Sequence, residues 1–181
     1  MLNSLWENIF RKHEKNTPDV LKENILFQDL SQKELRFVTH IVHIRNYHKN
    51  EAVFRQGEVG YGMYIIANGK VDITVEDSDR KAGNEEHQTH VARLVMGDFF
   101  GELALVEKNG KRSAHATAVE DTELIGFFKP NLFEILERKP ATGVKITLRL
   151  SEVLGQRLIE TTEKLTMLNE EISQLKAGTE R

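Results

Sequence analysis

Three patterns of hydrophobic and polar positions follow one another along the chain. Before about residue 40, apolar residues recur three and four positions apart, as on one face of a helix. From about Val38 to Phe128 the period changes to two, which is typical of strands with one buried face. After Pro130 the helical period returns. This order predicts a mainly β domain with flanking helices.

The start of the chain contains signals for two or three short helices. One face of a predicted first helix carries Leu5, Trp6, Ile9 and Phe10. Thr17-Pro18-Asp19 favours a second helix start, because proline fits a first turn and an acidic residue suits the positive end. Ser31 and Glu34 have the spacing of a capping box that opens a third helix. We interpret residues 1–24 as a helical extension, and the helices of residues 1–40 either cover the core or contact a partner.

Short segments with period two, separated by glycine-containing turns, are the predicted strands. They lie at residues 42–45, 63–66, 71–75, 91–94, 114–119 and 124–128. Many short strands with glycine turns indicate a sandwich or a jelly roll. Residues 77–89 are almost wholly polar and are predicted to form the exposed tip of a hairpin. We therefore assign residues 25–140 to one β domain.

Pro130 and Pro140 are each placed to start a helix, and the second of these helices is long. Its seam alternates steps of four and three residues through Leu154, Leu158, Thr161, Leu165, Leu168, Ile172 and Leu175. Such heptads usually form a coiled coil, and the alternative is a long helix packed on its own domain. We predict a dimerisation helix over residues 141–176, with contact between two copies at 150–175, and a polar tail at 177–181.

Two residues of this helix depart from the pattern. Gly155 costs about 1 kcal/mol relative to alanine inside a helix. We interpret it as a site of close packing against the β domain, with a flexible point as the alternative. Thr161 places a polar side chain on the seam, where such residues usually reduce stability. It is either tolerated there, or sets the register, or has a role outside the seam.

Composition narrows the classes of function. The 181 residues contain no cysteine, which excludes disulfides and cysteine-ligated metals and fits a reducing cytoplasm. No apolar run approaches the ~20 residues of a membrane helix. A net charge of −3 argues against a dedicated nucleic-acid surface. The histidine pairs His40/His43 and His87/His90 lie in strand or hairpin contexts without a carboxylate to complete a metal site. We find no catalytic motif and expect no enzyme activity.

Two neighbouring segments are suited to bind a small anion. Phe99–Leu105 reads as a tight turn that opens a short helix, and Arg112–Ala114 reads as the first residues of a strand. A phosphate prefers a fixed fork of donors, and Arg112 is the candidate for it. A phosphate also prefers the unpaired N–H groups of a first helical turn, which Leu103 and Ala104 would supply.

The other residues of these segments suit a nucleotide. Gly101 lets the backbone approach the ligand closely, and Ser113 beside the small Ala114 can add a hydroxyl group. Glu102 is an acceptor for a ribose 2′-hydroxyl. The alternative is a simple ion pair between Glu102 and Arg112, which would require neither the glycine nor the small residues. We therefore interpret the two segments as a phosphate-and-ribose site.

These segments closely resemble the phosphate-binding cassette of cyclic nucleotide-binding domains, through Phe100–Leu105 and Arg112–Ala114. The resemblance covers roughly residues 25–165 and includes segments that look like those of the family's β-roll turns, at 55–58, 64–66, 69–71 and 97–98. It implies a double-stranded β-helix, or jelly-roll, fold. It also implies that Glu102 takes the ribose hydroxyl, that Arg112 takes the phosphate, and that Ile73 and Val91 contact the ligand.

Within this family the chain most resembles the catabolite activator, or cyclic AMP receptor, branch, through residues 148–151, 157–158 and 161–164. In that branch two neighbouring hydroxyl residues meet the adenine, one from each subunit, which implies Thr161 and Thr162 here. Activators of the branch continue into a helix-turn-helix domain. Only a polar tail follows the long helix in this sequence, and so we expect no direct DNA binding.

The combined expectation is a cytoplasmic cyclic nucleotide sensor. Cyclic AMP is the preferred ligand and cyclic GMP a possible one, because Ser113 does not decide between them. We expect a parallel coiled-coil homodimer that signals to an unidentified protein partner, with no membrane and no metal involved. One alternative is a dimeric scaffold that ignores nucleotides. The other is a truncated cyclic AMP-responsive transcription factor.

Overall fold

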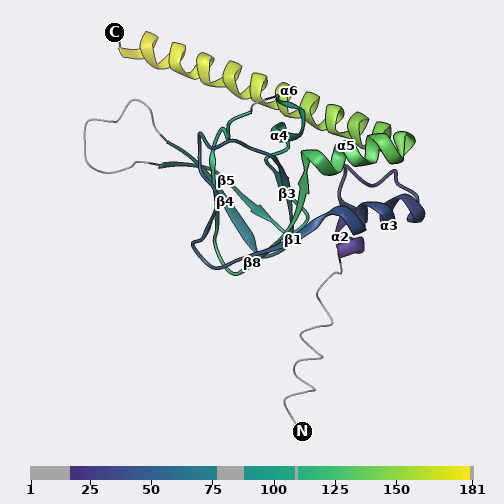
Figure 1. Ribbon diagram of the computed structural model, residues 1–181. Coiled ribbons are helices and arrows are strands. Elements are labelled where there is room, and N and C mark those ends of the chain that lie inside the picture. Colours follow the sequence, from purple (N-terminus) through teal and green to yellow (C-terminus); the bar gives the residue numbers. More distant parts are fainter. Residues whose placement is uncertain (1–16, 77–87, 109, 180–181) are drawn as a thin grey trace.

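Two antiparallel sheets of four strands form the centre of the protein (Figure 1). The computed structural model describes residues 17–76, 88–108 and 110–179. One sheet has the order β1 (His43–Tyr47), β8 (Thr122–Phe128), β3 (Gly62–Asn68) and β6 (Phe99–Phe100). The other has the order β2 (Ala52–Phe54), β7 (His115–Ala118), β4 (Lys70–Glu76) and β5 (Gln88–Val95). The predicted β-roll is confirmed.

The predicted strands are all present, and two further strands were not predicted. Strand β2 has three residues and β6 has two, which is too short to show a period of two in the sequence. Both are defined by their partners instead, since β2 pairs with β7 and Phe100 of β6 lies opposite Tyr64. Arg112–Ala114 precede β7 rather than open it, so the predicted strand begins one residue later, at His115.

The turns and hairpins between strands follow the glycines. Gly69 separates β3 from β4 with a φ of 89°, and a Cβ there would lie 2.4 Å from the Thr122 hydroxyl oxygen. Strands β4 and β5 pair along their length up to Glu76 opposite Gln88. Of the predicted hairpin tip at 77–89, residues 77–87 lie outside the described residues.

Among the described residues, two helices precede the sheets, α2 (Thr17–Glu23) and α3 (Gln32–Ile41), and both predicted starts are confirmed. The Ser31 N–H donates to Glu34 Oε2 at 2.8 Å, and the Glu34 N–H donates to Ser31 Oγ at 3.4 Å, which completes the capping box. The predicted first helix lies outside the described residues. Val20 and Leu21 of α2 are buried in the same core as the strands, and the division at residue 24 stays a prediction.

Two hydrophobic clusters hold the fold together. The larger one joins α2 and α3 to the outer face of the first sheet and to the C-terminal helices, and it includes Phe27, Ile65, Phe127, Ile146 and Leu150. The smaller one lies between the two sheets and contains Phe54, Ile66, Val71, Phe100, Ala116 and Leu124. The smaller cluster adjoins the cavity described below and fixes the strands that surround it.

The short helix α4 (Leu103–Val106) connects β6 to β7. Helices α5 (Lys129–Arg138) and α6 (Pro140–Thr179) follow the last strand, β8. The predicted starts at Pro130 and Pro140 are confirmed. Figure 1 shows α6 running over the sheets and projecting beyond them. Within the described part of the chain, no helix has the length and apolar character to cross a bilayer.

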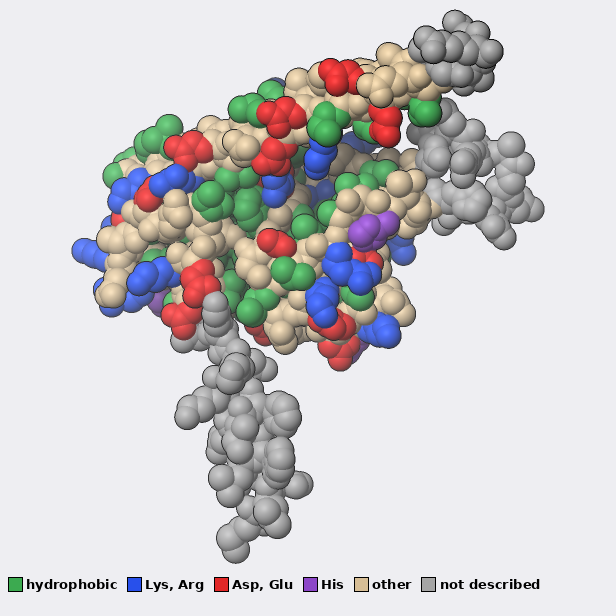
Figure 2. Space-filling model, turned by 180° about the vertical axis from the view of Figure 1, so that it is seen from behind, with side chains coloured by type: hydrophobic (Ala, Val, Ile, Leu, Met, Phe, Trp, Pro, Cys, Tyr) green, Lys and Arg blue, Asp and Glu red, His purple; other side chains and the backbone are tan. Residues whose placement is uncertain are grey.

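The two parts of α6 differ in their surroundings. Ile146, Leu150 and Val153 are buried, whereas the apolar side chains further along are exposed, namely Leu158, Leu165, Leu168, Ile172 and Leu175. Figure 2 shows hydrophobic side chains between charged ones on this projecting part. In the described part of the β domain, no atom lies within 4 Å of a Cβ placed on Gly155, so the interpretation that this glycine packs closely against the β domain is wrong.

Candidate functional site

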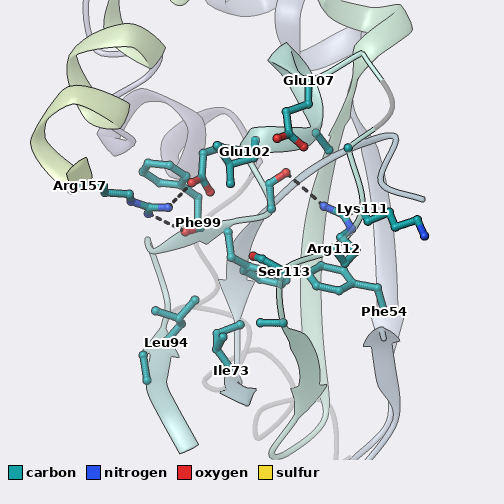
Figure 3. Close-up of a pocket in the computed structure, with 17 residues that line it drawn as sticks. Phe54, Ile73, Leu94, Phe99, Glu102, Glu107, Lys111, Arg112, Ser113 and Arg157 are labelled. Atoms are coloured by element: carbon teal, nitrogen blue, oxygen red, sulfur yellow. Dashed lines mark hydrogen bonds and ion pairs between the residues drawn. The ribbon is translucent and has the colours of Figure 1, made fainter. Parts of the chain in front are cut away.

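A cavity of about 270 Å³ opens between the second sheet, the segment around α4, and α6 (Figure 3). Its lining includes eight of the predicted site residues: Ile73, Gly101, Glu102, Leu103, Ala104, Arg112, Ser113 and Ala114. Phe54, Ala92 and Leu94 extend the apolar side beside Ile73. The volume is near the lower end of the range for small-ligand sites. The cavity therefore combines an apolar wall with one polar end.

Arg112 forms the cationic part of that polar end. The residue is 9% exposed, and its Nη1 donates to the Gly101 carbonyl oxygen at 3.1 Å. Its backbone is anchored on both sides, because its N–H donates to the Glu58 carbonyl and its own carbonyl accepts from the Gly57 N–H, both at 2.8 Å. Burial lowers the pKa of the guanidinium, which nevertheless stays charged because arginine titrates far above neutral pH.

Gly101 is required here for two physical reasons. Its φ is 76°, in the left-handed region that favours glycine. A Cβ at this position would also lie 2.4 Å from Arg112 Nη1. Any larger residue would therefore strain the turn and displace the guanidinium. The prediction that Gly101 lets the backbone approach a ligand closely stays a prediction, because the atom that a Cβ would meet here belongs to Arg112.

Glu102 pairs with a residue that the sequence did not single out as part of the site. Its side chain is 7% exposed, and Oε1 lies 2.5 Å from Arg157 Nη1 on α6. Arg157 Nη2 also donates to the Phe99 carbonyl oxygen at 3.2 Å, and the guanidinium lies over the Phe99 ring at 4.8 Å (Figure 3). The predicted alternative, an ion pair from Glu102 to Arg112, is not what forms. In the sequence, the one indication that Arg157 belongs to the site is its position one helical turn before Thr161.

The backbone at the start of α4 supplies fewer free donors than a long helix would. The helix has only four residues, with Glu102 at its N-cap. The Ala104 N–H donates to the Gly101 carbonyl at 3.2 Å, so a ligand would have to share that donor. Leu103, at the first helical position, lines the cavity and is 43% exposed. Its N–H is the better placed of the two predicted donors.

Val91 is not part of the cavity lining. Strand β5 contains a bulge in which Ile73 pairs with Ala92 and the next residue of β4, Thr74, pairs with His90. Val91 is the extra residue of this bulge and is 57% exposed. Ala92 lines the cavity in its place. A one-residue shift of this kind changes which side chains face inward.

Thr161 and Thr162 lie on α6 beyond Arg157 and do not line the cavity of the single chain. Both are exposed, and their hydroxyls donate to the carbonyls of Arg157 at 2.7 Å and Leu158 at 2.9 Å. Each hydroxyl oxygen can still accept a hydrogen bond.

The histidines form no metal site in the part of the chain that the structure describes, where no group of three or more His, Asp or Glu side chains could hold an ion. His90 instead contacts Asp72 Oδ1 at 3.2 Å, beside Arg93. The cavity thus combines the buried guanidinium of Arg112 with an apolar wall.

Comparison with known proteins shows which family the chain belongs to. The family model for the cyclic nucleotide-binding domain matches residues 44–139. The chain is 32% identical over 149 residues to the cyclic AMP receptor protein of Thermus thermophilus, which covers 82% of this chain and 64% of that protein. It is 30% identical over 129 residues to the cAMP-activated global transcriptional regulator CRP of Salmonella typhimurium, which covers 71% of this chain and 56% of that protein.

A solved structure shows the same likeness in three dimensions. The crystal structure of the Thermus thermophilus catabolite activator protein matches with a TM-score of 0.69 and 30% identity, over 81% of this chain and 63% of that chain. The chain thus spans less than two thirds of the length of these relatives. The matched segment contains both halves of the site, Gly101–Ala104 and Arg112–Ala114. The chain belongs to the cyclic nucleotide-binding domain family and resembles its cyclic AMP receptor branch.

Proposed function

We propose that this protein is a regulatory sensor of cyclic nucleotides that prefers cyclic AMP. The observation that carries the proposal is the buried guanidinium of Arg112 at the end of an apolar cavity. Among the described residues no carboxylate lies within ion-pair distance of it. A buried charge without a counter-ion is costly, and a bound anion would offset that cost.

The cavity offers a place for each part of such a ligand. Arg112 and the Leu103 N–H would bind the phosphate, and Ser113 would add a hydroxyl group. Glu102 would accept the ribose 2′-hydroxyl while it keeps its contact with Arg157. The base would then lie along the apolar wall of Ile73, Ala92 and Leu94.

The preference for cyclic AMP rests on the two threonines of α6. Their hydroxyl protons are used within the helix, so each oxygen acts toward a ligand as an acceptor. Adenine presents an amino donor where guanine presents a carbonyl acceptor. A base that reaches Thr161 of its own chain and Thr162 of a second chain would therefore be favoured as adenine.

Signalling would follow from the contact between Glu102 and Arg157. A ligand that engages Glu102 changes the environment of an ion pair that joins the cavity to α6. The same helix contacts the N-terminal region, since Lys145 Nζ lies 2.9 Å from Glu34 and Arg149 Nε lies 2.6 Å from Asp29. Ligand binding would then alter the geometry of an α6-mediated homodimer, or the docking of α2 and α3, and a partner protein would detect the change. Such a shift requires different affinities for the two states.

Calorimetry with cyclic AMP and cyclic GMP tests the proposal directly. The wild type is expected to bind cyclic AMP more tightly. Each charge-assisted hydrogen bond contributes about 1.5–3 kcal/mol, so Arg112→Leu is expected to weaken binding about 100-fold. Arg45→Leu is the control, because Arg45 is exposed on β1, away from the cavity. Equal heats for the wild type and Arg112→Leu, or no heat at all, would contradict the proposal.

A dimeric scaffold that ignores nucleotides is the second candidate, and the exposed seam of α6 favours it. A ligand that binds only the folded state raises the melting temperature as its concentration rises. A thermal-shift titration with cyclic AMP separates the two candidates. A rise in Tm supports the sensor, and an unchanged Tm with an intact dimer supports the scaffold.

A further inference from the structure

The guanidinium of Arg112 is held on an aromatic ring. Its Cζ lies 4.0 Å from the centroid of the Phe54 ring, and the Tyr64 ring is further away, at 6.0 Å. Gly60 also lies against it, because a Cβ at Gly60 would be 3.1 Å from both Cζ and Nε. Figure 3 shows the Phe54 ring beside the Arg112 side chain at the cavity wall. The buried cation therefore has an aromatic partner where a carboxylate would be usual.

The Phe54 ring is itself fixed in place. Phe54 is 9% exposed and lies at the end of β2, opposite Ala116 of β7. Its ring packs against Tyr64 at 6.3 Å and Phe100 at 5.7 Å, and these two rings stack on each other. A ring held by two aromatic neighbours cannot turn away without disrupting the cluster between the sheets.

This arrangement leaves most of the donors of Arg112 available. A guanidinium has five N–H donors. Among the described residues, the Arg112 side chain donates one hydrogen bond, to the Gly101 carbonyl. Contact with an aromatic ring uses none of these N–H donors, which are the groups that form a fork with phosphate. A side chain held in this way also loses less freedom when the ligand binds.

We propose that Phe54 is the residue that positions Arg112 for the ligand's phosphate, an inference that rests on the proposed function. The negative face of the ring stabilises the buried cation before the ligand arrives and fixes the direction of its donors. Leucine would fill much of the same space but would lack that face. The inference also gives the short strand β2 a role in binding, although Phe54 is its single contribution to the cavity lining.

Three variants test the role of the ring by calorimetry with cyclic AMP. Phe54→Leu is expected to weaken binding about 10-fold, the scale of a desolvated cation–π contact. Phe54→Tyr keeps the aromatic face and is expected to restore affinity to within about 3-fold of the wild type. Val71→Ala is the control, because Val71 is fully buried in the same cluster and does not line the cavity. It should lower stability and leave affinity unchanged.

A second measurement separates positioning from a general effect on the fold. In an Arg112→Gln background, Phe54→Leu should change the affinity for cyclic AMP by less than about 2-fold, because contacting residues that act through one interaction are not additive. A merely structural role would preserve the full effect in both backgrounds. The ligand-free protein gives a third readout, since the ring current of Phe54 should shift the Arg112 Nε–H resonance, and Phe54→Leu should remove that shift.

The outcomes distinguish the two proposals. If the wild type binds neither cyclic nucleotide, the proposed function fails and the positioning role fails with it. If the wild type binds and the Phe54→Leu variant binds equally well, the positioning role is overturned and the proposed function stands. The same holds if Phe54→Leu weakens binding by the same factor in the wild-type and Arg112→Gln backgrounds. Weakened binding that Tyr restores, with little further effect in the Arg112→Gln background, supports the inference.

Discussion

Gly97 and Gly101 share an unusual backbone conformation but have different surroundings. Their φ angles are 93° and 76°, so alanine strains the backbone at either position. Among the residues that the structure describes, none beyond its chain neighbours comes within 4 Å of a Cβ at Gly97, whereas at Gly101 that atom would lie 2.4 Å from Arg112 Nη1. Substitutions at the two glycines therefore separate the loss of stability from backbone strain from the loss of ligand affinity at the site.

We expect both Gly97→Ala and Gly101→Ala to lower the free energy of unfolding by about 1–2 kcal/mol, from backbone strain. Only Gly101→Ala should also weaken the binding of cyclic AMP, by about 10-fold or more, because it displaces the guanidinium. Urea unfolding measures the first effect and calorimetry the second. Equal affinities of the two variants would show that Gly101 serves the turn alone.

The pair of Glu102 and Arg157 predicts an asymmetry between two substitutions. Glu102 is 7% exposed on its side chain and Arg157 is 43% exposed. Arg157→Gln leaves a buried carboxylate without its cation and should lower the free energy of unfolding by about 1–3 kcal/mol. Glu102→Gln leaves a cation that water can still reach, so its cost should be smaller.

The double variant with glutamine at both positions is the control for this asymmetry. It contains neither charge, so it should recover part of the stability that Arg157→Gln loses. Chemical unfolding of the wild type, the two single variants and the double variant at neutral pH gives a double-mutant cycle for the pair. A cost of Glu102→Gln equal to that of Arg157→Gln would contradict the interpretation that burial of the carboxylate decides the effect.

At the scale of single residues, the sequence predicts site residues that lie close together along the chain. Gly101, Glu102 and Arg112 lie within a dozen residues, and each has a side chain or conformation that phosphate and ribose require, so their grouping is visible without the fold. Arg157 reaches Glu102 from 55 residues away, and no local pattern connects them. Val91 is displaced by a bulge that depends on how β5 pairs with β4, which the alternation within β5 cannot show.

Among the elements, α3 and α6 are joined through the carboxylate of Glu34. Lys145 Nζ lies 2.9 Å from Oε2, and the Thr142 hydroxyl donates to Oε1 at 3.0 Å. The bond from Lys145 is the main reason why the pKa of Glu34 falls from 4.5 to about 2, with the donors of Ser31 adding to it. The folded pKa lies below the unfolded one, so the carboxylate stabilises the fold above about pH 4.5 and loses that effect as pH falls toward 2.

Glu34→Gln should therefore lower the free energy of unfolding by about 1–2 kcal/mol at pH 7, including part of the helix cap. The difference from the wild type should shrink as the pH is lowered from 5 to 3. Urea unfolding across this range measures it, with Glu137→Gln on the exposed face of α5 as the control. A difference that stays constant with pH would show that the cap alone accounts for the effect.

The elements themselves were predictable where they are long or carry a terminal signal. The capping box and the two prolines define helix starts by local chemistry, and they are confirmed. Strands β2 and β6 escape prediction because two or three residues have no measurable period. Their existence depends on pairing with distant strands, yet β2 provides Phe54 and β6 leads into Gly101, so these strands matter directly to the site.

At the scale of the whole molecule, the projecting part of α6 is the feature that a single chain leaves unexplained. Leu158, Leu165, Leu168, Ile172 and Leu175 are each at least 47% exposed. Apolar residues spaced in this way on a projecting helix suit a second copy of the same helix. The exposed Gly155 agrees, since no described residue outside its own helical turn comes within 4 Å of a Cβ placed on it.

Leu168→Glu should convert the proposed dimer to a monomer, because two like charges would meet on the seam, and should raise the dissociation constant of the dimer by at least about 100-fold. Gln174→Glu adds the same charge at an exposed polar position off the seam and should leave the dimer intact. Sedimentation velocity distinguishes them. A dimeric Leu168→Glu would show that another surface joins the copies.

The monomeric variant also tests where the base is recognised. If Thr162 of a second chain contacts the base, Leu168→Glu should bind cyclic AMP more weakly and lose its preference over cyclic GMP, while Arg112 and Glu102 still bind phosphate and ribose. Thr162→Ala, which keeps the seam intact, should lose the preference without losing the dimer. If the monomer keeps the full preference for cyclic AMP, base recognition lies within one chain, along the apolar wall of the cavity, and the second chain serves only to transmit the signal.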